Sequence, residues 1–138
     1  MTRYLLDADA IIDFYRGFPD TVELIQSLYQ QGETLCTCAV VVVEVYAGLA
    51  PAEREQGEVL LATMQVMPMS IRAARQAGIW RYTYARRGRH LATTDCLIAA
   101  IAHERRATLI TGNTRDYPMP ELSKMPLPRR QNGSRERS

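Results

Sequence analysis

The stretch "RYLLDADAIIDFYRG", residues 3–17, places an acid directly after a short apolar run. Asp7 follows two leucines, and Asp9 and Asp13 come within the next six residues. A carboxylate that leaves water without a partner loses several kcal/mol of hydration free energy, so a buried strand that ends in Asp7 indicates a cation. The alternative is local, because carboxylates in the first turn of a following helix gain about 0.3–1 kcal/mol. Asp13, three residues before Arg16, is interpreted as structural.

The rest of the chain predicts one globular α/β domain over residues 1–128. Apolar, β-prone segments at residues 3–8, 33–38, 64–69 and 107–111 alternate with helical patterns at residues 19–32, 40–49, 51–64, 70–88 and 93–106. Thr93 or Thr94 is expected to cap the last helix. Such alternation predicts a mostly parallel sheet covered by helices, with ligands outside the carboxyl ends of its strands.

Composition narrows the class of protein. The 138 residues are 46% hydrophobic, enough for a substantial core. There is no signal-peptide pattern and no apolar run long enough for a membrane span, so we expect a cytoplasmic protein. Three cysteines without a CxxC pair predict buried thiols. Residues 129–138, "RRQNGSRERS", are predicted to form a disordered basic tail.

Four acids at the ends of predicted elements point to one pocket: Asp7, Glu44, Asp95 and Asp116. Like charges brought together repel unless a cation neutralises them. Oxygen ligands without accompanying His or Cys favour Mg²⁺ or Mn²⁺, which completes its shell with water and substrate phosphate. The pattern therefore predicts hydrolysis of a phosphodiester, with one carboxylate orienting or deprotonating the attacking water.

The motifs "LLD", "VVEVYAGL", "TDCLIAAIA" and "LITGNTRDY", in this order, resemble those of PIN-domain ribonucleases of the VapC toxin type. The resemblance implies a three-layer α/β/α sandwich and endonucleolytic cleavage of RNA, such as transfer RNA. It further implies a homodimer and a VapB-type antitoxin that inserts a segment into the acidic site. The implied site has Asp7 and Asp95 as Mg²⁺ or Mn²⁺ ligands, Asp116 beside them and Glu44 on the water. Thr111 and Asn113 match polar positions near that site.

The sequence departs from the family pattern after the first acid. Many relatives have a hydroxyl residue and then Asn or Ser there, where this chain has Ala8 and Asp9. Asp9 either joins the metal site or caps the following helix.

Two other functions stay open. "LLDADAI" and "LITGN" also resemble motifs of haloacid-dehalogenase-type phosphatases, but that class needs a phosphate-binding lysine and later acids, and it leaves Glu44 and Asp95 without roles. Lys124 is the chain's one lysine. The third possibility is a non-catalytic PIN-like binding module, which a missing acid would favour.

Arginines mark a possible RNA surface. Residues 59–94 contain six arginines and no acid, with Trp80, Tyr82 and Tyr84 interleaved. This composition suits a polyanion such as RNA, whereas the alternative is the solvated face of a helix. The arginines are Arg72, Arg75, Arg81, Arg86, Arg87 and Arg89.

Overall fold

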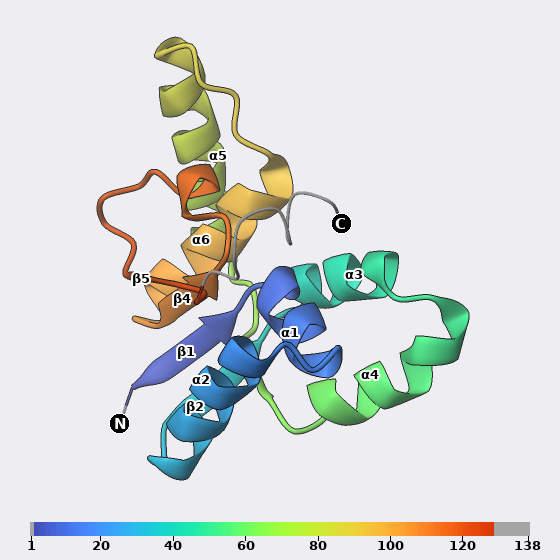
Figure 1. Cartoon of the computed structure of the whole chain (residues 1–138). Helices are drawn as coiled ribbons and strands as arrows, with labels where there is room; N and C mark the ends of the chain where they lie inside the picture. The colour runs from blue at the N-terminus through green and yellow to red at the C-terminus, as the bar shows by residue number, and fades with distance from the viewer. Residues whose placement is uncertain (1, 129–138) are drawn as a thin grey trace.

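A five-stranded parallel sheet forms the centre of the computed structural model, which describes residues 2–128 (Figure 1). The predicted basic tail lies outside the described residues. The strands follow the order β3-β2-β1-β4-β5, and every neighbouring pair is parallel. They are β1 (Arg3–Leu6), β2 (Thr34–Thr37), β3 (Gln65–Val66), β4 (Thr108–Thr111) and β5 (Lys124–Pro126).

Six α-helices surround the sheet within residues 2–128, as the three-layer prediction requires. Figure 1 shows α5 and α6 together on one side of the strands and α2 on the other, with α4 farther from the sheet. The helices are α1 (Ala8–Tyr15), α2 (Pro19–Gln30), α3 (Ala39–Gly48), α4 (Arg54–Leu61), α5 (Ile71–Arg86) and α6 (Thr93–Glu104). Two short 3₁₀ turns, η1 (Pro51–Glu53) and η2 (Thr114–Asp116), precede α4 and follow β4. The predicted α/β/α fold is confirmed.

The central strands are buried because helices pack on both of their faces. Leu5 and Leu6 of β1 and Leu109 and Ile110 of β4 are fully buried. Continuous apolar runs of this kind are typical of parallel strands inside a sheet. The carboxyl ends of β1 and β4 therefore lie side by side, with Leu6 opposite Ile110 in the register.

Two helices, α5 and α6, run in opposite directions side by side. Ser70, the N-cap of α5, accepts a hydrogen bond from the Ala73 N–H at 2.9 Å and donates to the carboxylate of Glu104, the last residue of α6, at 2.8 Å. Near the other end, Arg81 donates to the Leu91 carbonyl at 3.3 Å. The end of α5 thus lies beside the start of α6.

The structure differs from several local predictions. The N-cap of α6 is Ala92, which has no side-chain cap bond, so neither Thr93 nor Thr94 caps the helix. Pro51 begins the 3₁₀ turn η1 instead of the following α-helix. Arg16, which follows Asp13 by three residues, forms an ion pair with Glu53, with 3.4 Å between Arg16 Nη2 and Glu53 Oε1.

The cysteine prediction is confirmed: Cys36, Cys38 and Cys96 are free and buried. Within residues 2–128, no helix combines the length and apolar character needed to cross a membrane.

Candidate functional site: an acidic pocket at the carboxyl edge of the sheet

A pocket of about 340 Å³ opens at the carboxyl ends of β1 and β4. Its carboxylates come from four separate parts of the chain: the start of α1, the middle of α3, the start of α6 and η2. The four acids predicted from the sequence all line it, and so do Asp9 and Asn113. The complete lining is Asp7, Ala8, Asp9, Ile12, Glu44, Asp95, Asn113 and Asp116.

Asp7 is held most firmly, because both its backbone and its side chain are fixed. Its N–H donates to the Ile110 carbonyl at 2.9 Å, which continues the pairing of β1 with β4. The carboxylate is only 6% exposed. Its Oδ1 accepts the Ala8 N–H at 2.9 Å, as an N-cap of α1 does, and its Oδ2 accepts the hydroxyls of Thr111 at 2.8 Å and Tyr117 at 2.9 Å. The protein therefore orients this carboxylate without any ion.

Asp95 lies in the first turn of α6 and faces the other acids. The pKa of its carboxyl is raised to about 6, first by burial and then by the negative charges of Asp116, Asp7 and Glu44. A hydrogen bond from the Tyr117 hydroxyl, 3.3 Å from Oδ1, acts in the opposite direction. A carboxyl whose charge is disfavoured by its neighbours is the expected result of several acids gathered in one pocket.

Glu44 is half-buried on α3. Burial raises the pKa of its carboxyl, the charge of Asp7 adds to this rise, and a hydrogen bond with the Thr94 hydroxyl opposes it. This contact places the Thr94 side chain beside Glu44 and not at the N-cap of α6. Asp116 is exposed on η2 and borders the pocket.

Asp9 does not occupy the cap position, which belongs to Asp7. Its Oδ2 accepts the N–H of Gly112 at 2.8 Å and the side-chain amide of Asn113 at 3.4 Å. It therefore ties the start of α1 to the segment that follows β4, and it lines the pocket. The prediction that Asp9 caps the helix is wrong. Asp9 lies in the pocket with the other acids.

The pocket fits a hard divalent cation. Its charged ligands are all carboxylates, and those of Asp7 and Asp95 lie within 3.3 Å of one hydroxyl oxygen. Within residues 2–128, no group of three or more His, Cys, Asp or Glu side chains is arranged so that it could hold a metal ion. Mg²⁺ does not need such a group, because it binds through one or two carboxylates and keeps several waters.

Comparison with known proteins identifies the family of this fold. The family model described as "PIN domain" matches residues 4–122. This chain belongs to the PIN-domain family. It is 33% identical over 123 residues to Ribonuclease VapC10 of Mycobacterium tuberculosis, covering 89% of this chain and 92% of that protein. Ribonuclease VapC19 of the same species is 30% identical over 119 residues, covering 86% and 95%.

A solved structure of a PIN domain shares the fold. The crystal structure of VapBC2 from Rickettsia felis, bound to a DNA fragment from its promoter, superposes with a TM-score of 0.80 at 20% identity, covering 92% of this chain and 100% of that one. The family model and the two VapC ribonucleases confirm the resemblance to PIN-domain ribonucleases of the VapC toxin type. The PIN-domain match gives no support to the phosphatase alternative. That class needs a lysine that binds phosphate, whereas the ammonium group of Lys124 donates to the Tyr117 carbonyl.

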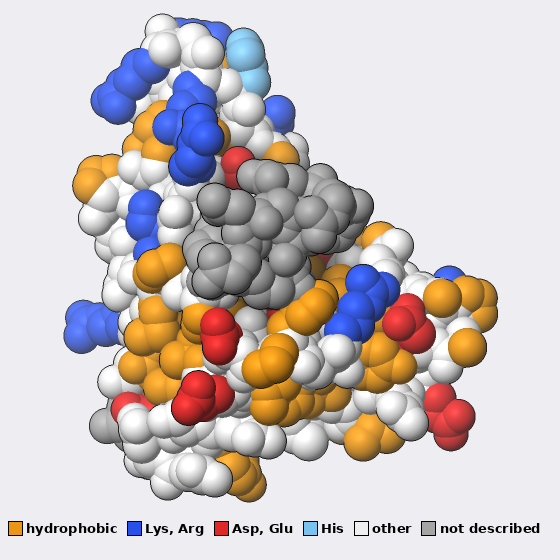
Figure 2. Space-filling model, in the orientation of Figure 1, with side chains coloured by type: hydrophobic (Ala, Val, Ile, Leu, Met, Phe, Trp, Pro, Cys, Tyr) orange, Lys and Arg blue, Asp and Glu red, His pale blue; other side chains and the backbone are white. Residues whose placement is uncertain are grey.

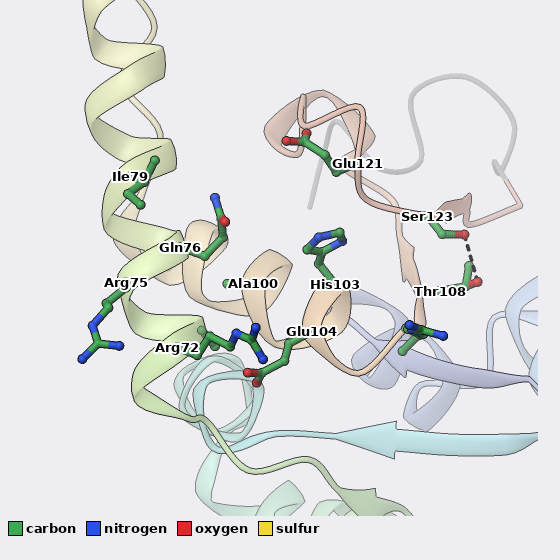
Figure 3. A pocket seen from close by; sticks show the side chains of 13 residues that line it. Arg72, Arg75, Gln76, Ile79, Ala100, His103, Glu104, Thr108, Glu121 and Ser123 are labelled. Atoms are coloured by element: carbon green, nitrogen blue, oxygen red, sulfur yellow. Dashed lines mark hydrogen bonds between the residues drawn. The ribbon is translucent and has the colours of Figure 1, made fainter.

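The six arginines of residues 59–94 fall into two groups, one at each end of α5. Figure 2 shows Lys and Arg side chains spread over the part of the molecule that Figure 1 identifies as α5. Arg72 and Arg75 line a separate pocket of about 760 Å³ between α5, α6 and the β4–β5 segment, beside His103 and Glu104 (Figure 3). Neither arginine lines the acidic pocket.

The second group lies at the other end of α5. Arg86 and Arg87 stack over the rings of Tyr82 and Tyr84, at 4.2 and 5.4 Å from the ring centres. Arg89 donates to the carbonyl of Arg115, the residue before Asp116. Arg89 therefore lies beside η2, which carries Asp116, and Arg81 contacts the Leu91 carbonyl in the segment that leads into α6.

Tyr117 is the site residue that sequence reasoning missed. It directly follows Asp116, is 1% exposed, and its hydroxyl touches two of the predicted acids. From the sequence, an aromatic residue after an acid is expected to be an ordinary core residue. Only the position of its hydroxyl in the fold shows that it belongs to the site.

Proposed function

We propose that this PIN domain is a metal-dependent endoribonuclease that acts as the toxin of a toxin–antitoxin pair. The observation that carries the proposal is the convergence of Asp7, Glu44, Asp95 and Asp116 on one pocket at the edge of the sheet. We propose Mg²⁺ or Mn²⁺ as the cofactor, because the charged ligands of the pocket are oxygen atoms.

Within this proposal each acid has a distinct role. Asp7 and Asp95 bind the ion directly, since their carboxylates share the Tyr117 hydroxyl and thus lie next to each other. The bound ion supplies a water of lowered pKa and positive charge beside the phosphate. Asp116, exposed at the rim, completes the surroundings of the ion.

Glu44 is proposed to orient or deprotonate the attacking water. Burial and the charge of Asp7 raise the pKa of its carboxyl, which makes it a better proton acceptor than an exposed glutamate. The hydrogen bond with Thr94 holds the side chain toward the pocket. Glu44 comes from α3, whereas Asp7 and Asp95 come from the starts of α1 and α6, so the base and the ligands approach from different elements.

The substrate contacts that we propose come from the end of α5 and the loop that follows it. Arg81 and Arg86 lie in the second half of α5, Arg87 and Arg89 follow it, and Arg89 contacts the residue before Asp116, so we propose that this group binds phosphates next to the cleaved bond. Arg72 and Arg75 belong to the opposite end. Their contribution to RNA binding is expected to be smaller.

A VapB-type antitoxin is the proposed protein partner, and a cytoplasmic homodimer is the proposed form of the toxin. The support comes from solved structures of the same fold, several of which are VapBC complexes. An acidic pocket also suits the binding of a cationic side chain from a partner, because a guanidinium pairs with two carboxylate oxygens.

The test is RNA cleavage by the purified protein. Total RNA and transfer RNA are incubated with Mg²⁺, with Mn²⁺ and with excess EDTA, and Asp95→Asn runs in parallel to exclude contaminating nuclease. The proposal predicts metal-dependent cleavage that the variant lacks. Turnover of a phosphatase substrate without RNA cleavage would revive the phosphatase alternative. Metal binding without either activity would indicate a non-catalytic binding module.

A further inference from the structure

Tyr117 has a hydroxyl that the proposed reaction does not use. The residue follows η2, and its ring is buried at the carboxyl edge of the sheet. Its oxygen lies 2.9 Å from Asp7 Oδ2 and 3.3 Å from Asp95 Oδ1. One side chain thus contacts both proposed metal ligands without lining the pocket itself.

We propose that Tyr117 is a positioning residue that determines which oxygen atoms of Asp7 and Asp95 face the metal. This inference rests on the proposed function. It goes beyond that function because it assigns a role to a residue outside the acid set, and because it specifies how Asp7 binds the ion.

The hydrogen bonds of Asp7 leave one direction open. An ionised carboxylate has about four acceptor positions, two on each oxygen. Thr111 and Tyr117 use both positions on Oδ2, at 2.8 and 2.9 Å, and the Ala8 N–H uses one on Oδ1, at 2.9 Å. The remaining position is on Oδ1. Asp7 is therefore expected to bind the ion through Oδ1 alone, which leaves room for the waters that Mg²⁺ retains.

The Tyr117 hydroxyl carries a single proton for two carboxylates. The shorter contact, to Asp7, is the stronger hydrogen bond, while Asp95 lies at the edge of hydrogen-bond distance. The hydroxyl therefore lies between the two carboxylates, and its bond to Asp7 would keep Oδ2 turned away from a bound ion.

The rest of the residue is well placed to hold this hydroxyl still. The Tyr117 N–H donates to the Thr114 carbonyl at 3.1 Å, and the Tyr117 carbonyl accepts the ammonium group of Lys124. Bonds on both sides of the residue, together with a buried ring, fix the position of the phenol oxygen. Partners of this kind, behind the ligands of a metal, usually contribute about 10- to 100-fold to metal affinity or activity.

The substitution Tyr117→Phe removes the hydroxyl and keeps the ring. We expect Mn²⁺ affinity, measured by isothermal titration calorimetry, to fall about tenfold or more, and kcat to fall while KM for RNA stays unchanged. A residue that only supports the fold would lower the melting temperature without changing the Mn²⁺ affinity of the folded protein.

Tyr84→Phe is the matched control. Its hydroxyl donates to the carbonyl of Pro118, the residue next to Tyr117, at 3.3 Å. The control therefore removes a tyrosine hydroxyl bonded to the same segment but not to an acid. Its Mn²⁺ affinity should equal that of the unsubstituted protein, and a loss equal to that of Tyr117→Phe would overturn the positioning role.

A second measurement uses the unsubstituted protein and does not depend on the folding of a variant. The Cζ resonance of Tyr117 in a ¹³C-tyrosine-labelled sample should shift on titration with Mg²⁺, whereas that of Tyr84 should not. Binding of Mg²⁺ with an unmoved Tyr117 resonance, or with an unchanged Mn²⁺ affinity in Tyr117→Phe, overturns this inference alone. Absence of any metal binding by the unsubstituted protein overturns the proposed function as well.

Discussion

The hydroxyl of Thr111 donates to the carboxylate of Asp7 across 2.8 Å, although 104 residues separate the two in the chain. Parallel pairing of β1 with β4 brings them together, since Leu6 and Ile110, the residues just before them, are partners in the register. Thr111 also accepts the Asn113 N–H at 3.0 Å. One buried hydroxyl thus links the sheet, the first acid and the segment that leads to Asp116.

Replacement of Thr111 by Val tests this link, because valine has nearly the same shape and no hydroxyl. The Asn113 N–H loses its acceptor and Asp7 loses a donor, so we expect the free energy of unfolding to fall by about 1–3 kcal/mol in urea denaturation. Mn²⁺ affinity should fall as well. Thr111→Ser retains the hydroxyl and serves as the control. A valine variant equal to the serine variant in both measurements would contradict the link.

Asp95→Asn should stabilise the metal-free protein. The folded protein raises the pKa of Asp95 to about 6 from an ordinary value of 3.8, so the folded state holds a proton that the unfolded chain has already released. The stability associated with this group is complete at pH values below about 4 and is lost as the pH rises toward 6 and above. Asparagine resembles the protonated form, so its melting temperature in EDTA should exceed that of the unsubstituted protein at pH 7. At pH 4 the difference should shrink.

Asp7→Asn should have the opposite effect on stability. From charge repulsion alone, both substitutions would stabilise the protein. The carboxylate of Asp7, however, accepts three hydrogen bonds, from Ala8, Thr111 and Tyr117, and an amide has one oxygen and a donor group to offer to them. We expect a lower melting temperature than that of the unsubstituted protein in EDTA. An increase similar to that of Asp95→Asn would mean that repulsion outweighs these bonds.

The sequence predicted much of this architecture because the decisive signals are local. An acid directly after a buried strand, as at Asp7, and an acid in the first turn of an apolar helix, as at Asp95, both specify the carboxyl edge of a parallel sheet. The short edge strand β5 was not predicted, since three residues that include Pro126 carry little β signal. The cap of α6 was predicted wrongly because Thr94 has a tertiary partner, Glu44.

The role of Tyr117 could not be predicted, for a different reason. Its contacts with Asp7 and Asp95 depend on the register of β1 with β4, which brings together residues far apart in the chain. The two groups of arginines, by contrast, follow from helix geometry. Fifteen positions separate Arg72 from Arg87, which is about 22 Å along a helix.

Metal affinity should depend on pH in the range where Asp95 titrates. Below a pKa of about 6 the ion must displace the proton of Asp95, so Mn²⁺ affinity should rise about tenfold per pH unit up to pH 6 and then level off. Calorimetry at pH 5, 6 and 7 measures this directly. Asp95→Asn removes the titrating group, so whatever weak binding it retains should not show this step. A pH-independent affinity in the unsubstituted protein would exclude Asp95 as a ligand.

Substitution of α5 arginines should separate the end of the helix that binds RNA from the end that does not. Arg89 is bonded to the carbonyl before Asp116, and Arg87 packs over Tyr84, whereas Arg72 and Arg75 line the distant pocket. Arg87→Gln with Arg89→Gln should reduce the slope of log K against log salt for RNA binding by about 1 to 2, since each lost phosphate contact removes roughly 0.7–0.9. Binding is measured in EDTA to prevent cleavage. Arg72→Gln with Arg75→Gln has the same change in charge and should leave the slope unchanged. Equal slopes for both pairs would mean that the net charge of α5 acts at long range, and not through phosphate contacts beside the acids.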